Sequence, residues 1–152
     1  MCVFIRILAT AMLFVSFSSL SNAKLSEGET APAFEAKLIS NQKFNLETAK
    51  GQVVILHFWA TWCPPCVQEL PSLQLLSESQ TSDLVVLTVN VKEGPQRVQR
   101  FMQSMDLTLP TLFDRRGEWT RRLGISTLPS TLLINTQGRT SQIVQGEVNW
   151  VG

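Results

Sequence analysis

The chain has 152 residues, of which 44% are apolar and 16% charged, and its formal net charge is +1. This length and composition indicate a single globular domain and exclude disorder and collagen-like repeats. The near-zero charge, without a dense cluster of lysine or arginine, gives no basis for binding nucleic acid or a membrane surface.

Residues 1–23 have the pattern of a secretory signal peptide. One early cation is followed by an apolar run over residues 7–17, and small residues precede an expected cleavage site after Ala23. The run is shorter than the ~20 residues that span a bilayer, which favours cleavage over an uncleaved membrane anchor. We therefore expect an exported, periplasmic protein whose mature domain is residues 24–152. A protein anchored by its uncleaved signal is the alternative.

Export determines what the cysteines can do. Cys2 is lost with the signal peptide, so the mature chain keeps only Cys63 and Cys66. In a compartment that permits disulfides, a bond across so short a loop adds little stability to a domain of this size. The pair is therefore expected to carry redox chemistry. A purely structural disulfide and half of a zinc site that includes His57 are the alternatives.

The predicted elements follow the order of an α/β domain. The expected elements, in chain order, are a strand or hairpin at 34–39 and 43–46, a buried strand at 53–60, a helix from 63 to about 80, a buried strand at 84–91, a helix that starts at 93–95, a short strand at 108–113, a short helix at 118–123, and a hairpin of 131–134 with 141–145. Helical crossovers followed by a hairpin imply a mixed sheet with helices on both faces.

The predicted chemistry lies where the first buried strand meets the helix. A thiolate at a helix N-terminus is stabilised by free N–H groups and by the helix dipole, so Cys63 is the predicted nucleophile. Cys66, almost one turn further, is the less exposed cysteine that resolves a mixed disulfide. Pro64 and Pro65 suit the first turn but leave fewer amides for the thiolate. Because a stabilised thiolate makes a disulfide more oxidising, we expect a reductant rather than a strong oxidant.

Residues 58–66, Phe-Trp-Ala-Thr-Trp-Cys-Pro-Pro-Cys, followed by Glu-Leu-Pro at 69–71, resemble the active-site segment of the TlpA/ResA/CcmG-like thiol-disulfide oxidoreductases of the thioredoxin superfamily. The resemblance extends to residues 28–34, 123–131 and 133–138 and so covers nearly the whole mature chain. It implies a thioredoxin fold with an N-terminal strand or hairpin extension. Family members usually continue past the hairpin with a further helix, which is short or missing here.

The resemblance also assigns roles to single residues. It implies that Pro129 is cis and packs against the cysteine pair, and that Leu128 offers backbone hydrogen bonds to a substrate chain. Trp62, beside the nucleophile, is a further candidate for substrate contact, although packing explains an indole equally well. Glu69 takes the place of a glutamate that tunes the cysteines, since a carboxylate near a thiol raises its pKa or passes a proton. An ordinary solvated helix residue is the alternative for Glu69.

His57 is a departure from the family pattern, in which aspartate or asparagine is usual at this position. It is the only histidine of the chain. A histidine that titrates near neutral pH could accept the Cys66 proton or stabilise the Cys66 thiolate. A neutral core histidine with satisfied nitrogens is the alternative.

The resemblance implies an enzyme that reduces disulfides in periplasmic proteins, with apocytochrome c as one possible substrate and a membrane thiol donor of the DsbD type as the source of electrons. We expect a monomer without a cofactor or metal.

Three other functions are alternatives. A peroxiredoxin-like peroxidase has a similar fold, but its Thr-x-x-Cys context is absent. A copper chaperone of the related exported type needs a later histidine, and none follows His57. The third is a redox-inactive interaction module.

Overall fold

The structure is a computed structural model that describes residues 26–31, 35–79 and 82–150. The predicted signal peptide and its cleavage site lie outside the described residues. Within them, no helix combines the length and the apolar character that crossing a membrane requires.

Every element expected from the sequence is present. The bounds are β1 Glu35–Lys37, β2 Lys43–Asn45, the 3₁₀ helix η1 Leu46–Ala49, β3 Val53–Trp59, α1 Pro64–Glu78, β4 Leu84–Val91, α2 Pro95–Ser104, β5 Thr111–Asp114, α3 Glu118–Arg122, β6 Ser130–Ile134 and β7 Thr140–Gln145. The largest shift is in β5, which was expected to begin at Thr108. Pro110, which lacks an N–H, precedes the first residue of β5.

The predicted mixed sheet flanked by helices is confirmed. Five strands lie in the order β5-β4-β3-β6-β7, while β1 and β2 form a separate antiparallel pair. β3 is parallel to β4 and antiparallel to β6, so it is the central strand. Because β3 and β4 are parallel neighbours, the loops that follow them leave the sheet at the same edge. That edge carries the Cys63–Cys66 segment.

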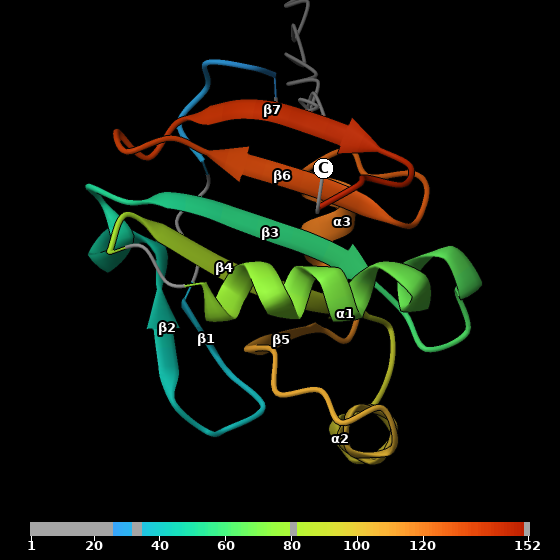
Figure 1. The fold of residues 1–152 in the computed structure, drawn as a ribbon. Helices are drawn as coiled ribbons and strands as arrows, with labels where there is room; N and C mark the ends of the chain where they lie inside the picture. Colours follow the sequence, from blue (N-terminus) through green and yellow to red (C-terminus); the bar gives the residue numbers. More distant parts are fainter. Residues whose placement is uncertain (1–25, 32–34, 80–81, 151–152) are drawn as a thin grey trace, which may run out of the picture.

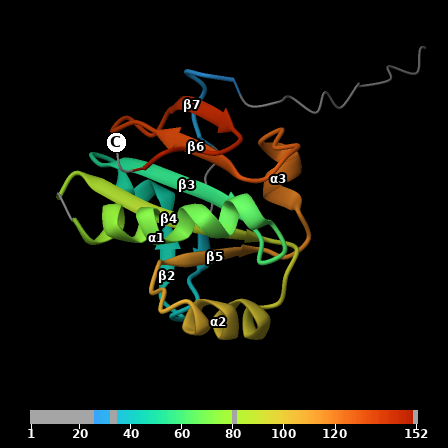
Figure 2. The same ribbon diagram turned by 45° about the vertical axis from the view of Figure 1, so that its right-hand side comes forward.

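The sheet separates two hydrophobic cores (Figures 1 and 2). Side chains alternate along β3: Val54, Leu56 and Phe58 enter one core, whereas Ile55 and Trp59 enter the other. The first core also takes residues of η1 and the region of α3. The second is covered by α1 and α2 and includes both cysteines. Helices therefore cover both faces, and the sheet alternation directs His57 toward α1.

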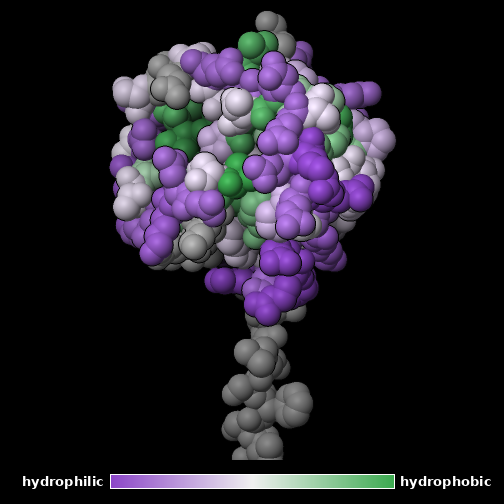
Figure 3. All heavy atoms as spheres, turned by 90° about the horizontal axis from the view of Figure 1, so that it is seen from below, coloured by the Kyte–Doolittle hydropathy of each residue, from purple (hydrophilic) through white to green (hydrophobic). Residues whose placement is uncertain are grey.

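The outward side of α2 is polar. Val98 and Met102 are its buried residues, and its other positions are mainly glutamine and arginine. Seen from below, the molecule presents a mostly hydrophilic surface with small hydrophobic areas (Figure 3).

Within the described residues, no helix follows β7. The chain turns at Gly146, whose N–H donates to the carbonyl oxygen of Pro129 at 2.9 Å. Residues 147–150 then extend to α1, where Val148 and Trp150 bind the side chain of Glu69. This C-terminal segment brings the end of the described chain into contact with Glu69 of α1 and His57 of β3.

Candidate active site

Cys63 and Cys66 form a disulfide at the junction of β3 and α1, with their Cα atoms 5.3 Å apart. Cys63 is the residue that precedes the helix, and Pro64 and Pro65 occupy its first positions. Neither proline has an N–H, so two of the donors that a helix N-terminus normally presents are missing. Cys63 retains 4% of its surface exposed, whereas Cys66 is fully buried. Of the two cysteines, only Cys63 therefore keeps any surface in contact with solvent.

The segment after α3 lies against the disulfide. The Leu128–Pro129 peptide bond is cis. Leu128 packs against the core cluster that contains both cysteines. A groove beside this contact is lined by Trp62, Lys92, Ile125, Thr127 and Leu128, among others. Trp62 is 62% exposed, which makes it an indole presented to solvent rather than packed in the core.

His57 is fully buried on the α1 side of β3. Its Nδ1 lies 3.1 Å from the hydroxyl of Thr131 and 3.8 Å from Oε2 of Glu69. Its Nε2 has no hydrogen-bond partner. Burial lowers the pKa of His57 to about 4, because the interior disfavours the imidazolium. His57 is therefore neutral at pH 7, contrary to the expectation of a histidine that titrates near neutrality.

Glu69 is only 6% exposed, so it is not the solvated helix residue considered as an alternative. Its Oε1 accepts from the backbone N–H of Val148 at 2.8 Å, and its Oε2 accepts from the indole N–H of Trp150 at 2.9 Å. Burial raises the pKa of Glu69 above its usual value, and the two hydrogen bonds oppose that rise. The first turns of α1 thus hold a carboxyl group whose ionised form is destabilised by burial, and the two hydrogen bonds offset only part of that destabilisation.

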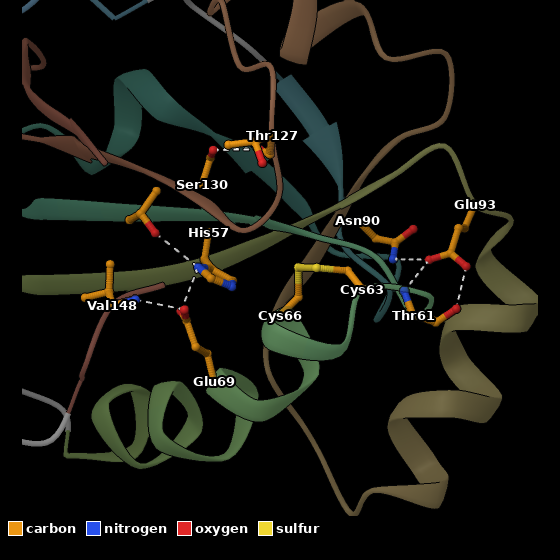
Figure 4. The surroundings of a disulfide bond; sticks show 11 residues. His57, Thr61, Cys63, Cys66, Glu69, Asn90, Glu93, Thr127, Ser130 and Val148 are labelled. Atoms are coloured by element: carbon orange, nitrogen blue, oxygen red, sulfur yellow. Dashed lines mark hydrogen bonds and ion pairs between the residues drawn. A yellow bond between two sulfur atoms is a disulfide. The ribbon is translucent and has the colours of Figure 1, made fainter. Parts of the chain in front are cut away.

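Figure 4 shows Glu69 and His57 together on the Cys66 side of the disulfide. Trp150 contacts both of them, since its ring also lies edge-on to the imidazole with the ring centroids 6.0 Å apart. The structure thus brings the predicted site residues Glu69 and His57 together with Trp150, to which the sequence analysis assigned no role. No signal in the sequence indicates Trp150, because it lies 81 positions from Glu69.

A second buried carboxylate, Glu93, lies on the Cys63 side of the disulfide (Figure 4). It accepts hydrogen bonds from the backbone N–H and the hydroxyl of Thr61 and from the side-chain amide of Asn90. Arg97 pairs with it at 3.0 Å. Sequence reasoning missed this cluster, although one signal was available: Glu93 follows the second predicted buried strand, as Thr61 follows the first.

Across residues 26–31, 35–79 and 82–150, no three side chains among His, Cys, Asp and Glu are grouped so as to hold a metal ion. Two clusters of polar groups, each built around a buried carboxylate, lie beside the disulfide. One surrounds Glu69 near Cys66, and the other surrounds Glu93 near Cys63. The arrangement can exchange disulfides at Cys63 and can hold a proton at Glu69.

Comparison with known proteins gives a consistent assignment. The sequence profile of the AhpC/TSA family matches residues 28–143. The chain is 31% identical over 147 residues to the thiol-disulfide oxidoreductase ResA of Geobacillus thermodenitrificans, which is 95% of this chain and 84% of that protein. It is 34% identical over 130 residues to the sporulation thiol-disulfide oxidoreductase A of Bacillus subtilis, with coverages of 83% and 78%.

Solved structures agree with this assignment. StoA from Bacillus subtilis matches with a TM-score of 0.71 at 32% identity, over 78% of this chain and 91% of that one. A putative thiol:disulfide interchange protein DsbE from Chlorobium tepidum matches with a TM-score of 0.75 at 26% identity, over 82% and 89% of the two chains. The expected thioredoxin fold is thereby confirmed. The chain belongs to the AhpC/TSA family and is a thiol-disulfide oxidoreductase of the ResA type.

Proposed function

We propose that this protein is an exported reductant that transfers two electrons from its Cys63–Cys66 dithiol to disulfides in other proteins. The observation that carries the proposal is the placement of the Cys63–Cys66 disulfide at the start of α1, next to a groove that includes Trp62 and Leu128. A disulfide that only stabilised the fold would not need a groove beside its more exposed cysteine.

The reaction proceeds in two exchanges. The thiolate of Cys63 attacks one sulfur of the substrate disulfide, so that a mixed disulfide forms and the other substrate sulfur leaves as a thiolate. The thiolate of Cys66 then attacks the sulfur of Cys63, which re-forms the disulfide of the protein and releases the second substrate thiolate. A dithiol donor outside this chain must return the two electrons before the next cycle.

Glu69 is the group we assign to accept the proton of Cys66. Its raised pKa matches that task, because a carboxyl group with a raised pKa takes up a proton more readily at neutral pH. Neutral His57 lies beside this carboxyl group, 3.8 Å from Oε2 and beyond hydrogen-bond distance, so we assign the proton to Glu69 alone. The proton then passes to a departing substrate thiolate or to water.

The reducing direction follows from how weakly the helix stabilises the Cys63 thiolate. Pro64 and Pro65 at the first two helical positions contribute no N–H to a negative sulfur. A thiolate that receives less stabilisation makes the dithiol a stronger electron donor. The pair therefore favours reduction of its substrate.

Substrate and compartment complete the proposal. Trp62, together with the backbone of Leu128 beside Pro129, holds the chain that flanks the substrate disulfide. Residues 1–23 direct export, and residues 24–152 form the mature thioredoxin-like domain, which works as a monomer in the periplasm. Apocytochrome c is one substrate of this kind, and a membrane thiol donor of the DsbD type supplies electrons.

Trapping the mixed disulfide tests this proposal. Cys66→Ser should accumulate covalent adducts with disulfide-containing proteins of the periplasm, because the second exchange is blocked. The matched variant Cys63→Ser should form none, since it lacks the nucleophile. Equal trapping by both variants, or by neither, would contradict the assignment. Consumption of hydrogen peroxide that depends on Cys63 would favour the peroxidase alternative instead.

A further inference from the structure

Glu93 is a buried ionisable group that the two exchanges do not use. Its side chain is only 5% exposed, and the residue lies in the loop that follows β4, two positions after the last residue of that strand. Thr61 follows β3 at the same edge. Since β3 and β4 are parallel neighbours, the loop that carries Thr61 and Cys63 lies beside the loop that carries Glu93.

The carboxylate of Glu93 is held by donors on both oxygens. Oε2 accepts from the backbone N–H of Thr61 at 2.7 Å and from the side-chain amide of Asn90 at 2.8 Å. Oε1 accepts from the hydroxyl of Thr61 at 2.6 Å and pairs with Nε of Arg97 at 3.0 Å. Burial alone would raise the pKa of Glu93, but the bonds from Thr61 and Asn90 and the charge of Arg97 outweigh burial and lower it. Glu93 is therefore ionised at neutral pH.

We propose that Glu93 is a positioning residue that anchors the loop before Cys63 and, through its fixed negative charge, disfavours the Cys63 thiolate and makes the cysteine pair more reducing. The inference deepens the proposed function and rests on it for the role of Cys63. It adds a determinant of redox potential on the side of the disulfide away from Glu69.

Two effects of the hydrogen-bonded cluster around Glu93 both disfavour the Cys63 thiolate. A negative charge near a thiol disfavours its ionisation, and the low exposure of Glu93 limits the screening of that charge by water. In addition, the N–H of Thr61 is committed to Glu93 and is not available to a negative sulfur. The guanidinium of Arg97 opposes the charge of Glu93, but its side chain is 65% exposed, so solvent weakens its field.

Other ionisable groups also lie near the Cys63–Cys66 pair. Lys92 lines the groove together with Trp62, and its positive charge favours the thiolate whether or not Glu93 is charged. Glu69 and neutral His57 lie on the Cys66 side of the disulfide. Substitution of Glu93 leaves all three in place, so a change in the potential reports the Glu93 cluster.

The test is the reduction potential of the pair as a function of pH in Glu93→Gln, with thiolate absorbance as a direct second readout. Loss of the charge should make the acid dissociation constant of the Cys63 thiol about threefold larger, which corresponds to a potential about 15 mV less reducing at pH values where the thiolate is fully formed. The difference should vanish at pH values where the thiol is protonated, because a neutral sulfur responds little to a charge.

Glu93→Gln could also change the potential by loosening the loop before Cys63. Two further variants separate the effect of the charge from that structural effect. Arg97→Gln changes an exposed residue and should shift the potential in the opposite direction, since the charge of Glu93 then acts without its counter-ion. Glu47→Gln removes an equal, exposed charge from η1, at the other end of β3, and should shift nothing. Three results would overturn the proposal. The potential of Glu93→Gln could differ from that of the parent by the same amount at all pH values, the potentials of Glu93→Gln and Arg97→Gln could shift in the same direction, or neither potential could shift. A parent protein that proves to be an oxidant would refute the proposed direction instead and leave these differences measurable.

Discussion

The indole N–H of Trp150 donates a 2.9 Å hydrogen bond to the carboxyl group of Glu69, although 81 positions separate the two residues. The same carboxyl group also accepts from the backbone N–H of Val148. Residues 147–150 therefore act on the active site from outside the Cys-x-x-Cys motif, through the charge state of Glu69.

Trp150→Phe should slow the second exchange at acidic pH. The indole N–H lowers the pKa of Glu69, so its removal raises that pKa further and leaves less carboxylate to accept the Cys66 proton. The acid limb of the rate profile for mixed-disulfide resolution should therefore move to higher pH. Rapid-quench measurement of the mixed disulfide across pH provides the check.

A double-mutant cycle separates this effect from loss of packing. Glu69→Gln removes the ionisable group, so adding Trp150→Phe to it should leave the pH profile unchanged. Loss of the hydrogen bond itself should lower the free energy of unfolding by roughly 2 kcal/mol in the single variant. A profile that moves equally in both backgrounds would show that Trp150 acts by some route other than Glu69.

His57 should make the fold sensitive to acid. Its pKa is about 4 in the folded protein and 6.5 in the unfolded chain, so between these values only the unfolded chain binds the proton. Stability should therefore be complete at neutral pH and should fall by about 3 kcal/mol as the pH drops from 7 to 4. Denaturant unfolding of the parent and of His57→Asn at the two pH values measures this contribution as the difference between the proteins. If the parent and His57→Asn lost the same free energy of unfolding between pH 7 and pH 4, this contribution of His57 would be contradicted.

Trp62→Ala should weaken substrate binding without affecting the fold. Trp62 is 62% exposed and adjoins the groove, so truncation should change the free energy of unfolding by less than about 0.5 kcal/mol. KM for a protein disulfide should rise by about tenfold, or ~1.4 kcal/mol. The rate with a small disulfide that does not fill the groove should stay the same. Leu75→Ala, which removes a similarly exposed side chain of α1, serves as the control and should leave KM unchanged.

Sequence patterns predicted the fold well because its central elements carry strong local signals. The apolar run of β3 and the proline pair at the start of α1 have few alternative interpretations, and both elements are where they were expected. The same signals place Cys63 at a helix start. His57 was also correctly singled out as unusual, but its titration was misjudged, because the loss of water around a side chain depends on the whole fold.

The partners of the two carboxylates could not be predicted in the same way. Trp150 reaches Glu69 only because β7 ends near Pro129 and the chain then turns toward α1. Such a contact between residues far apart in sequence leaves no periodicity or spacing to detect. Glu93 was closer to prediction, since parallel neighbouring strands bring their following loops together, but nothing in the sequence shows which polar residue of the loop turns inward.

The reduction potential of the Cys63–Cys66 pair in residues 24–152 tests the central claim most directly. The protein would be equilibrated in thiol-disulfide buffers of known potential, and the thiols that remain would be trapped and counted. A reductant of protein disulfides should have a value at or below about −230 mV, and a value near −120 mV would instead make the protein an oxidant of folding proteins and contradict the proposed direction of electron flow.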